Sequence, residues 1–118
     1  MKVSRGDVVM ADFPFAAEGA SKVRPVLVVQ ADFYNQRIEN SLVAMLTTNL
    51  RNASDKAHFL VDISTREGQQ TGLKQNSLIS CTNVATLHES RFRRVIGHLP
   101  DSAMRQVDAC LKAAFGMS

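Results

Sequence analysis

The sequence predicts a mainly β fold that ends in one α-helix, arranged as a compact antiparallel barrel or sandwich. Six short apolar segments, rich in β-branched residues, are bounded by Gly, Pro, Asn, Asp or Ser, as expected for strands joined by turns. After Pro100 the apolar residues recur at spacings of three and four, which is the helical period. With 118 residues and no internal repeat, the chain is expected to form a single domain over residues 1–118.

The predicted strands are short runs of apolar and β-branched residues. The second run follows Lys22 and Arg24, and Pro25 suits its first position, because a proline there removes no ladder hydrogen bond. Arg24 is therefore expected at the mouth of a buried strand. Loops are expected over residues 16–22 and 49–56. The six predicted strands span residues 8–13, 25–30, 41–47, 58–63, 78–87 and 94–99.

The last predicted element is a helix that follows Pro100 and lays its apolar side on the strands. Asp101 or Ser102 is expected to cap its first turn, and Gly116 is expected to end it. For residues 33–40 the sequence leaves open a short helical turn or a loop. The apolar stripe of the predicted helix consists of Met104, Val107, Leu111, Ala114 and Phe115.

Composition and charge limit the class of protein. Apolar residues make up 45% and charged residues 21% of the chain, which is ordinary for a globular domain. No segment has the ~20 consecutive apolar residues of a membrane span. The N-terminus lacks the apolar stretch of a secretion signal, so a cytoplasmic protein is expected. The net charge of +3 and the pI near 9.2 favour an anionic partner.

The sequence gives no sign of metal or cofactor chemistry. His58, His88 and His98 have no paired spacing and no neighbouring Cys or carboxylate cluster of zinc type. Cys81 and Cys110 lack metal-ligand spacing and lie in apolar segments, so buried free thiols are expected. Neither a phosphate-binding glycine loop nor a serine-hydrolase elbow occurs. No metal ion and no other cofactor are therefore expected.

Polar residues gather at the ends of two predicted strands. Arg24 begins the second strand, and Thr47 and Thr48 end the third. If these strands are antiparallel neighbours, Arg24 and Thr47 meet at one rim, which faces the loop that carries Glu18 and Lys22. An arginine can stabilise charge on a pentavalent phosphate while a hydroxyl holds a nonbridging oxygen, so the cluster suits phosphodiester cleavage. Spacing alone leaves open a structural role, in which Arg24 caps loop carbonyls and the threonines satisfy strand ends.

Four segments carry a resemblance to a known family over nearly the whole chain. In their order and spacing, the sequence resembles the MazF/PemK-like (Kid-like) toxins of type II toxin–antitoxin systems. The segments are RGDVVMADF at 5–13, KVRPVLVVQAD at 22–32, LVAMLTTN at 42–49 and TGLKQNSLISCTNVATLHESR at 71–91. The resemblance implies a small SH3-like β-barrel with a C-terminal helix, the CcdB/MazF-type toxin fold, working as a homodimer.

The resemblance also implies an activity and a partner. Members of this family are mostly metal-independent endoribonucleases that cut single-stranded RNA (mRNA) at short sequence motifs. A cognate antitoxin protein inhibits them by laying a flexible tail across the RNA groove. The catalytic arginine and threonine of the family fall on Arg24 and Thr47. In the implied reaction the ribose 2'-hydroxyl attacks the adjacent phosphorus, which leaves 2',3'-cyclic phosphate and 5'-hydroxyl ends.

Two departures from the family pattern leave the general base open. Some relatives carry a glutamate five positions before the catalytic arginine; that position is Gly19 here, and Glu18 lies one residue earlier. Other relatives place an arginine and an aspartate in the fifth strand, where this chain has Ser80 and Thr82. Glu18 is kept as a catalytic candidate, beside solvent or a histidine that the fold brings in.

RNA contacts are expected over a wider surface. Basic side chains give salt-dependent phosphate contacts that do not read sequence, and aromatic rings can stack on splayed bases. Thr48, Ser80 and Thr82 add polar contacts. A solvated surface role is open for each basic residue, and packing is open for Phe33. The phosphate candidates are Lys22, Arg51, Lys56, Lys74, Arg91, Arg93 and Arg94, and the stacking candidates are Phe15, Phe33 and Tyr34.

Two other functions stay open at this point. A gyrase poison of the CcdB type shares the fold but acts through residues of its C-terminal helix and needs no Arg–Thr pair. A catalytically inactive family member would bind RNA or an antitoxin without cutting. The Arg-Pro segment together with Thr47 favours the ribonuclease over the gyrase poison.

Overall fold

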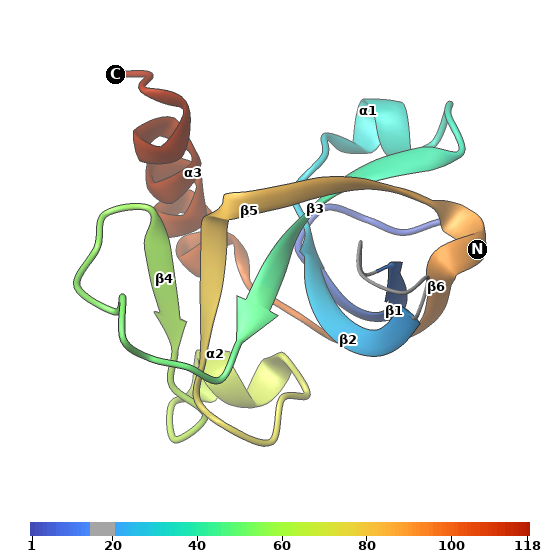
Figure 1. The fold of residues 1–118 in the computed structure, drawn as a ribbon. Coiled ribbons are helices and arrows are strands. Elements are labelled where there is room, and N and C mark those ends of the chain that lie inside the picture. The colour runs from blue at the N-terminus through green and yellow to red at the C-terminus, as the bar shows by residue number, and fades with distance from the viewer. Residues whose placement is uncertain (15–20) are drawn as a thin grey trace.

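A computed structural model of the chain describes residues 1–14 and 21–118, and these residues have the predicted mainly β architecture with a C-terminal helix (Figure 1). The strands are β1 (Asp7–Pro14), β2 (Ser21–Val28), β3 (Asn40–Thr47), β4 (His58–Val61), β5 (Ser77–His88) and β6 (Phe92–His98). The helices are α1 (Asp32–Asn35), α2 (Arg66–Gln70), the 3₁₀ turn η1 (Glu89–Arg91) and α3 (Asp101–Phe115).

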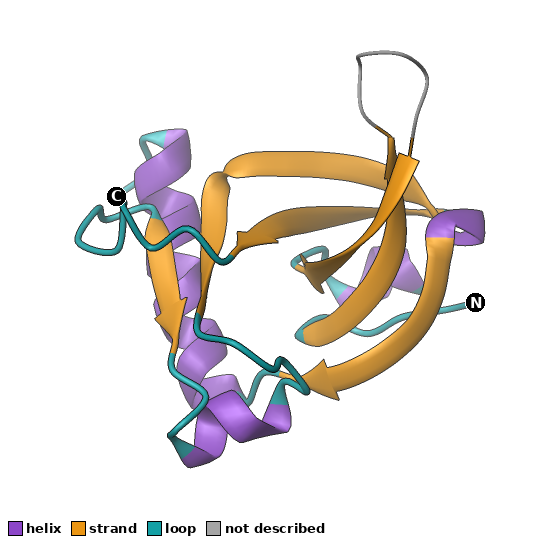
Figure 2. Ribbon diagram, turned by 60° about the horizontal axis from the view of Figure 1, so that its bottom comes forward, coloured by secondary structure: helices purple, strands orange, loops and turns teal. Residues whose placement is uncertain are grey.

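The strands form one curved antiparallel sheet. Their order is β4-β5-β3-β2-β1-β6, so β4 and β6 are its two edges. In Figures 1 and 2 the strands curl around a common interior, and α3 runs along the outer side of the sheet beside β4 and β5. The predicted small β-barrel fold is confirmed, in the form of a barrel-like sheet that is not closed.

A break in register bends β5 in its middle. Ala44 of β3 pairs with Val84, but the next residue, Met45, pairs with Ser80. Residues 81–83 are therefore extra on the β5 side of the ladder, as in an extended β-bulge. Figure 1 shows the sharp bend of β5 at its crossing from the α3 side to the far side of the sheet. The bend presents the first half of β5 to β4 and the second half to the start of β3.

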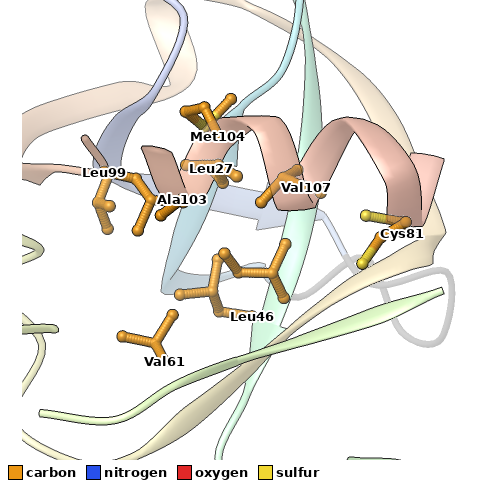
Figure 3. Close-up of a cluster of buried hydrophobic side chains, with 12 residues drawn as sticks. Leu27, Leu46, Val61, Cys81, Leu99, Ala103, Met104 and Val107 are labelled. Carbon is orange, nitrogen blue, oxygen red and sulfur yellow. The ribbon is translucent and has the colours of Figure 1, made fainter. Parts of the chain in front are cut away.

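Alternate residues of the strands build two cores on opposite faces of the sheet. Leu27 and Leu46 belong to the cluster that packs on α3, together with Val107 of that helix (Figure 3). Val26 and Met45, their neighbours in sequence, belong to the cluster on the opposite face. The continuous apolar runs that predicted the strands thus place apolar side chains on both faces, because α3 covers one face and the curled sheet covers the other.

Helix α3 has the predicted extent but not the predicted start. Pro100 is its N-cap residue and makes no side-chain hydrogen bond there, so the cap expected from Asp101 or Ser102 was wrong. Asp101 instead lies in the first turn, where its charge favours the helix dipole. Gly116 ends the helix in the left-handed conformation, at φ 69°, as predicted. No helix within the described residues is long and apolar enough to cross a membrane.

The outer turn of α3 also departs from the prediction. Phe115 is 65% exposed, because the helix runs past the edge of the apolar cluster in its last turn. Met104 and Val107 are buried as expected, and Cys110 is buried beside them. Cys81 and Cys110 are free thiols in the interior, which confirms the prediction for both cysteines.

Strand β2 begins earlier than predicted. It starts at Ser21, so Lys22 is a strand residue and Pro25 lies in the strand interior, opposite Met10 of β1. The proline is tolerated because β2 pairs with β3 only from Val26 onward, so no β3 carbonyl needs the missing N–H. For residues 33–40 the structure decides in favour of a short helix, α1, and a turn that follows it.

Candidate active site

Arg24 and Thr47 lie on neighbouring antiparallel strands, as predicted. Val26 pairs with Met45 in the β2–β3 ladder, and the same register carried two residues further sets Arg24 opposite Thr47. Residues opposite each other in an antiparallel pair project from the same face. Among the described residues the β2–β3 ladder ends at Val26–Met45, so the arginine and the threonine stand at its open end.

A pocket of about 270 Å³ lies at this open end, and both Arg24 and Thr47 line it. Met45 and Leu78 contribute apolar surface. Of the described residues around the pocket, Arg24 is the one with a permanent charge. The other hydrogen-bonding side chains of the lining are Asn49, Asn52, His58, Ser80 and Asn83.

The two predicted catalytic side chains are presented differently. Arg24 is half-buried within β2. Its backbone is held in the sheet by pairing with Ala11 of β1. Thr47 is exposed at the end of β3, and its Oγ1 accepts a hydrogen bond of 3.1 Å from the N–H of Asn49. Because that oxygen accepts from the backbone, its own O–H can donate to a ligand oxygen.

A chain of side-chain hydrogen bonds reaches the same pocket from the edge strand. His58 begins β4 and stands opposite Ser80 of β5. Its Nδ1 lies 2.7 Å from Oδ2 of Asp55, and its Nε2 lies 3.2 Å from Oγ of Ser80. Ser80 Oγ lies 3.2 Å from Oγ1 of Thr82. The order Asp55–His58–Ser80–Thr82 thus runs from a surface loop to the pocket wall.

The charge of Asp55 sets the direction of these hydrogen bonds. The hydrogen bond with His58 lowers the pKa of the Asp55 carboxyl, and the N–H of Ala57 lowers it further. Asp55 is therefore a carboxylate at neutral pH and can only accept. Nδ1 of His58 must carry a proton, and in the neutral ring Nε2 then accepts from the hydroxyl of Ser80.

Sheet register explains why these groups share one face. Ser80 pairs with Met45 on one side and with His58 on the other, while Thr47 pairs with Leu78. The row that contains Ser80 and the row that contains Thr47 are neighbours on one face of the sheet. Both rows point away from α3, because Leu46, which lies between Met45 and Thr47, packs on that helix. Arg24, Thr47, Ser80 and His58 consequently come from four strands to one face.

Several predicted residues lie close to this pocket. Thr48, Arg51 and Lys56 are exposed on the segment after β3 that also carries Asn49 and Asn52. Ser80 lines the pocket, and Thr82 is exposed beside it. Lys22 is exposed on β2, two positions before Arg24, so it shares a face with that residue. Glu18 and Phe15 lie outside the described residues, as does Gly19.

Other predicted residues lie elsewhere. Lys74 and Arg94 line a separate pocket of about 300 Å³, with Met10 and Pro25. Arg93 donates from Nε and Nη2 to the carboxylate of Asp12, at 3.0 and 2.9 Å.

Arg91 lies in η1, which follows the far end of β5. Phe33 and Tyr34 are exposed on α1, which is joined to the start of β3 by the hydrogen bond from Ser41 Oγ to Asn35. They are therefore at the opposite end of β3 from Thr47, and Phe33 is not a core residue of this chain.

Sequence reasoning missed Asp55, Asn52 and Asn83, and it left open a histidine brought in by the fold without singling out His58. The three-residue spacing of Asp55 and His58 at the start of an apolar run was visible, but it does not by itself indicate a site. The partner Ser80 lies 22 positions away from His58. Only the pairing of β4 with β5 brings the two together.

Fold and pocket together define a class: a small barrel-like β domain with a C-terminal helix and a pocket suited to an anionic ligand. A family model described as "PemK-like, MazF-like toxin of type II toxin-antitoxin system" matches residues 4–115. The chain therefore belongs to the PemK-like and MazF-like toxin family.

Individual relatives agree with the family match over nearly their full lengths. Endoribonuclease EndoA of Bacillus subtilis is 31% identical over 118 residues, which cover 99% of this chain and 97% of the relative. Endoribonuclease MazF6 of Mycobacterium tuberculosis is 31% identical over 114 residues, which cover 95% of this chain and 96% of the relative.

Solved structures share the fold. Mycobacterium tuberculosis toxin MazF-mt6 has a TM-score of 0.77 and 26% identity, with 95% of this chain and 98% of that chain covered. A MazE-MazF crystal structure from Deinococcus radiodurans has a TM-score of 0.75 and 19% identity, with both chains fully covered at 100%.

Proposed function

We propose that this protein is the toxin of a type II toxin–antitoxin system and acts as a metal-independent, sequence-specific endoribonuclease on single-stranded RNA. The observation that carries the proposal is that Arg24 and Thr47, from two strands, line the same pocket. The family match and the endoribonuclease relatives support it. The net charge of +3 suits an RNA substrate.

The proposed reaction needs three things from the pocket. Thr47 donates its hydroxyl proton to a nonbridging oxygen and so orients the phosphate. Arg24 stabilises the negative charge that develops on the pentavalent phosphorus, through charge-assisted hydrogen bonds. The 2'-hydroxyl of the same nucleotide loses its proton and attacks phosphorus, the bond to O5' breaks, and the products are a 2',3'-cyclic phosphate and a 5'-hydroxyl. RNA binding is assigned to Lys22, exposed two positions before Arg24, and to Arg51 and Lys56, exposed on the segment that carries Asn49 and Asn52.

Two partners belong to this proposal. The first is a cognate antitoxin protein that covers the RNA-binding face, in keeping with the family description. The second is another copy of the chain, since the resemblance implies a homodimer. Size-exclusion chromatography with light scattering tests the homodimer, and a monomeric mass at working concentration would contradict it. Growth arrest on expression without an antitoxin tests the toxin, and vigorous growth at high expression would contradict it.

The direct test is cleavage of a long single-stranded RNA by purified protein in the presence of EDTA. Wild-type protein is expected to give discrete fragments with cyclic phosphate ends, and Arg24→Ala is expected to give none. Arg105→Ala is the matched control, because Arg105 is exposed on α3, and it should cut like the wild type. Intact RNA with wild-type protein would overturn the nuclease, and gyrase-linked DNA breaks would select a gyrase poison instead.

A further inference from the structure

We infer that Asp55, His58 and Ser80 form a proton relay in which Ser80 receives the proton of the substrate 2'-hydroxyl and His58 is its final acceptor. This inference rests on the proposed function, because it names the general base of that reaction. It starts from the two side-chain hydrogen bonds of His58 at the pocket. His58 connects a carboxylate on one ring nitrogen to a hydroxyl on the other, at 2.7 and 3.2 Å.

The protonation states of Asp55 and His58 suit a general base. The lowered pKa of Asp55 keeps that side chain ionised, so it holds the proton of His58 on Nδ1 and leaves the Nε2 lone pair directed at Ser80. Removing a proton from the substrate places a positive charge on the ring, and the neighbouring carboxylate stabilises that charge. The side chain of His58 is only 9% exposed, so its ring orientation is held by protein contacts as well.

Ser80 connects the histidine to the place where the phosphate would lie. Thr47 pairs with Leu78, so Ser80, two residues further along β5, is the diagonal neighbour of Thr47. Diagonal neighbours in an antiparallel pair are roughly 7–8 Å apart between Cα atoms, a separation that one ribose–phosphate unit spans. A phosphate held by Thr47 and Arg24 would thus have its 2'-hydroxyl within reach of Ser80.

Thr82 shows how a substrate hydroxyl would enter the relay. When Ser80 donates its proton to Nε2 of His58, its oxygen accepts from Thr82, 3.2 Å away. Thr82 is exposed and follows Ser80 in the bulged part of β5, where the ladder with β3 is interrupted. The 2'-hydroxyl of RNA would take the place of the Thr82 hydroxyl as donor to Ser80.

Within residues 1–14 and 21–118, few charged or titratable groups lie around His58. Asp55 faces it from the preceding loop, and Arg24 faces the pocket from β2. Behind the sheet, Cys81 of β5 and Cys110 of α3 have pKa values that burial raises, so both thiols are neutral at physiological pH. Among the described residues, the carboxylate of Asp55 is thus the charge in direct contact with the imidazole.

The step balances as follows. The 2'-hydroxyl gives its proton to Oγ of Ser80 while Ser80 gives its own to Nε2 of His58, and the 2'-oxygen forms its bond to phosphorus. The bond from phosphorus to O5' breaks, and the leaving oxygen takes a proton from water. The imidazolium returns its proton to solvent, which restores the starting state with no net consumption of acid or base.

The experiment measures single-turnover cleavage of a short RNA that contains one cut site, across acidic and neutral pH. Wild-type rate is expected to fall tenfold for each unit of decreasing pH once His58 is protonated. His58→Gln should cut about 10²–10⁴-fold more slowly and lose that dependence on acid. Ser80→Ala should lose it too.

The matched control is His88→Gln. His88 also lies between a hydroxyl and a carboxylate, with Nδ1 2.9 Å from Ser90 Oγ and Nε2 3.0 Å from Glu39. It is at the far end of β5, outside the pocket, so this variant should retain the wild-type rate and pH profile. Asp55→Asn is a second variant, which changes an exposed side chain and keeps its size; thermal melting checks that it folds. It should slow cutting, because the imidazole loses the carboxylate that holds its proton on Nδ1.

Binding of the same oligonucleotide with a 2'-deoxyribose at the cut site separates chemistry from affinity. His58→Gln should bind it as the wild type does. The inference is overturned if His58→Gln keeps the acid limb, if Ser80→Ala cuts at the wild-type rate, or if His58→Gln loses binding as much as cutting. In these three cases wild-type cutting still supports the proposed function. Cutting of the deoxy oligonucleotide would overturn both the inference and the proposed 2'-hydroxyl reaction, and an inactive wild type would likewise remove both.

Discussion

Arg24 and Thr47 face one pocket although 23 positions separate them in the chain. In each strand the residue two positions away on the same face is buried: Val26 in β2 and Met45 in β3. The guanidinium and the hydroxyl are therefore held by packed backbone and need little reordering when a phosphate arrives. Such prior placement is the main way in which a protein stabilises charge that develops in a transition state.

Substitution of Thr47 separates the hydroxyl from the shape of the side chain. Thr47→Val keeps the branched shape and removes the donor, so kcat/KM for RNA cleavage should fall by about 10²-fold. Thr47→Ser keeps the hydroxyl and should retain most of the activity. Steady-state cleavage assays check both, with thermal melting to show that the variants fold. Equal activity of the valine and serine variants would contradict a role for the hydroxyl.

Gly97 and Gly116 form a second matched pair. An alanine Cβ at position 97 would lie 2.2 Å from the carbonyl carbon of Thr71 and 2.3 Å from the carbonyl oxygen of Gln70. Backbone must move to relieve that overlap, so Gly97→Ala should lower the free energy of unfolding by about 3 kcal/mol.

Gly116→Ala meets no atom within 4 Å but has φ +69°, so it should cost about 1 kcal/mol. Urea denaturation of both variants measures the difference. Equal losses at positions 97 and 116 would show that the contact of Gly97 with the α2 region is looser than the structure indicates.

The buried thiol of Cys81 predicts both a reactivity and a pH dependence. Burial raises the pKa of Cys81 from 9.0 to about 12, so the thiol stays protonated at neutral pH and should react with a thiol reagent far more slowly in native than in urea-unfolded protein. A raised pKa favours the folded state below the unfolded value, and this contribution is lost as pH rises from about 9 toward 12.

Cys81→Ala should therefore show a weaker loss of stability over that alkaline range than the wild type. Mass spectrometry after timed labelling checks the reactivity, and denaturation at a series of pH values checks the linkage. Rapid labelling of Cys81 in native protein would contradict its burial.

Arg5 joins the N-terminal segment to three parts of the fold. Its Nε donates to the carbonyl of Val29 at 2.9 Å, its Nη2 pairs with Asp108 of α3, and its backbone N–H donates to Asp32 at 2.7 Å. Arg5→Ala should lower the free energy of unfolding by about 1–3 kcal/mol, because partly buried acceptors lose charge-assisted hydrogen bonds. Chemical denaturation measures the loss.

Lys2→Ala is the control for Arg5. Lys2 makes an exposed ion pair of 3.2 Å with Glu89, and exposed pairs contribute only about 0–1 kcal/mol. A loss for Arg5→Ala no larger than that for Lys2→Ala would mean that the partly buried partners of Arg5 add nothing.

Arg51 and Lys56 allow a test of the RNA-binding surface. Both are exposed on the segment after β3 that also lines the pocket. If each contacts one phosphate, each alanine variant should reduce the slope of log K against log salt by about 0.7, the value for single strands. Fluorescence anisotropy with an uncleavable RNA analogue measures the slopes. Unchanged slopes would remove these residues from the binding surface.

The strands and the last helix could be read from local pattern. The runs that become β1, β3 and β6 alternate or cluster apolar residues between turn residues, and the spacing after Pro100 is helical, so each element was found to within a few residues. Pro25 misled the reading of β2, because a proline looks like a strand start. Its place inside the strand depends on how far β3 extends beside it.

The candidate site was only half predictable. The resemblance assigned Arg24 and Thr47, and antiparallel pairing of two consecutive strands was enough to expect them together. His58 and Ser80 meet through β4 and β5, with the α2 region inserted between those strands. No local feature of either segment predicts that register, so the sequence could not single out His58 among the three histidines.

The sequence by itself determined which segments become strands and helix, that both cysteines are buried, and which family the chain resembles, because these properties depend on short-range periodicity and motif spacing. Tertiary structure decided which side chains share the pocket. The shift between Ala44–Val84 and Met45–Ser80 sets the face on which Ser80 appears. The packing of Leu46 and Val61 against α3 turns Thr47 and His58 to the opposite side. Both effects come from contacts between distant parts of the chain, whose free energy exists only in the folded protein.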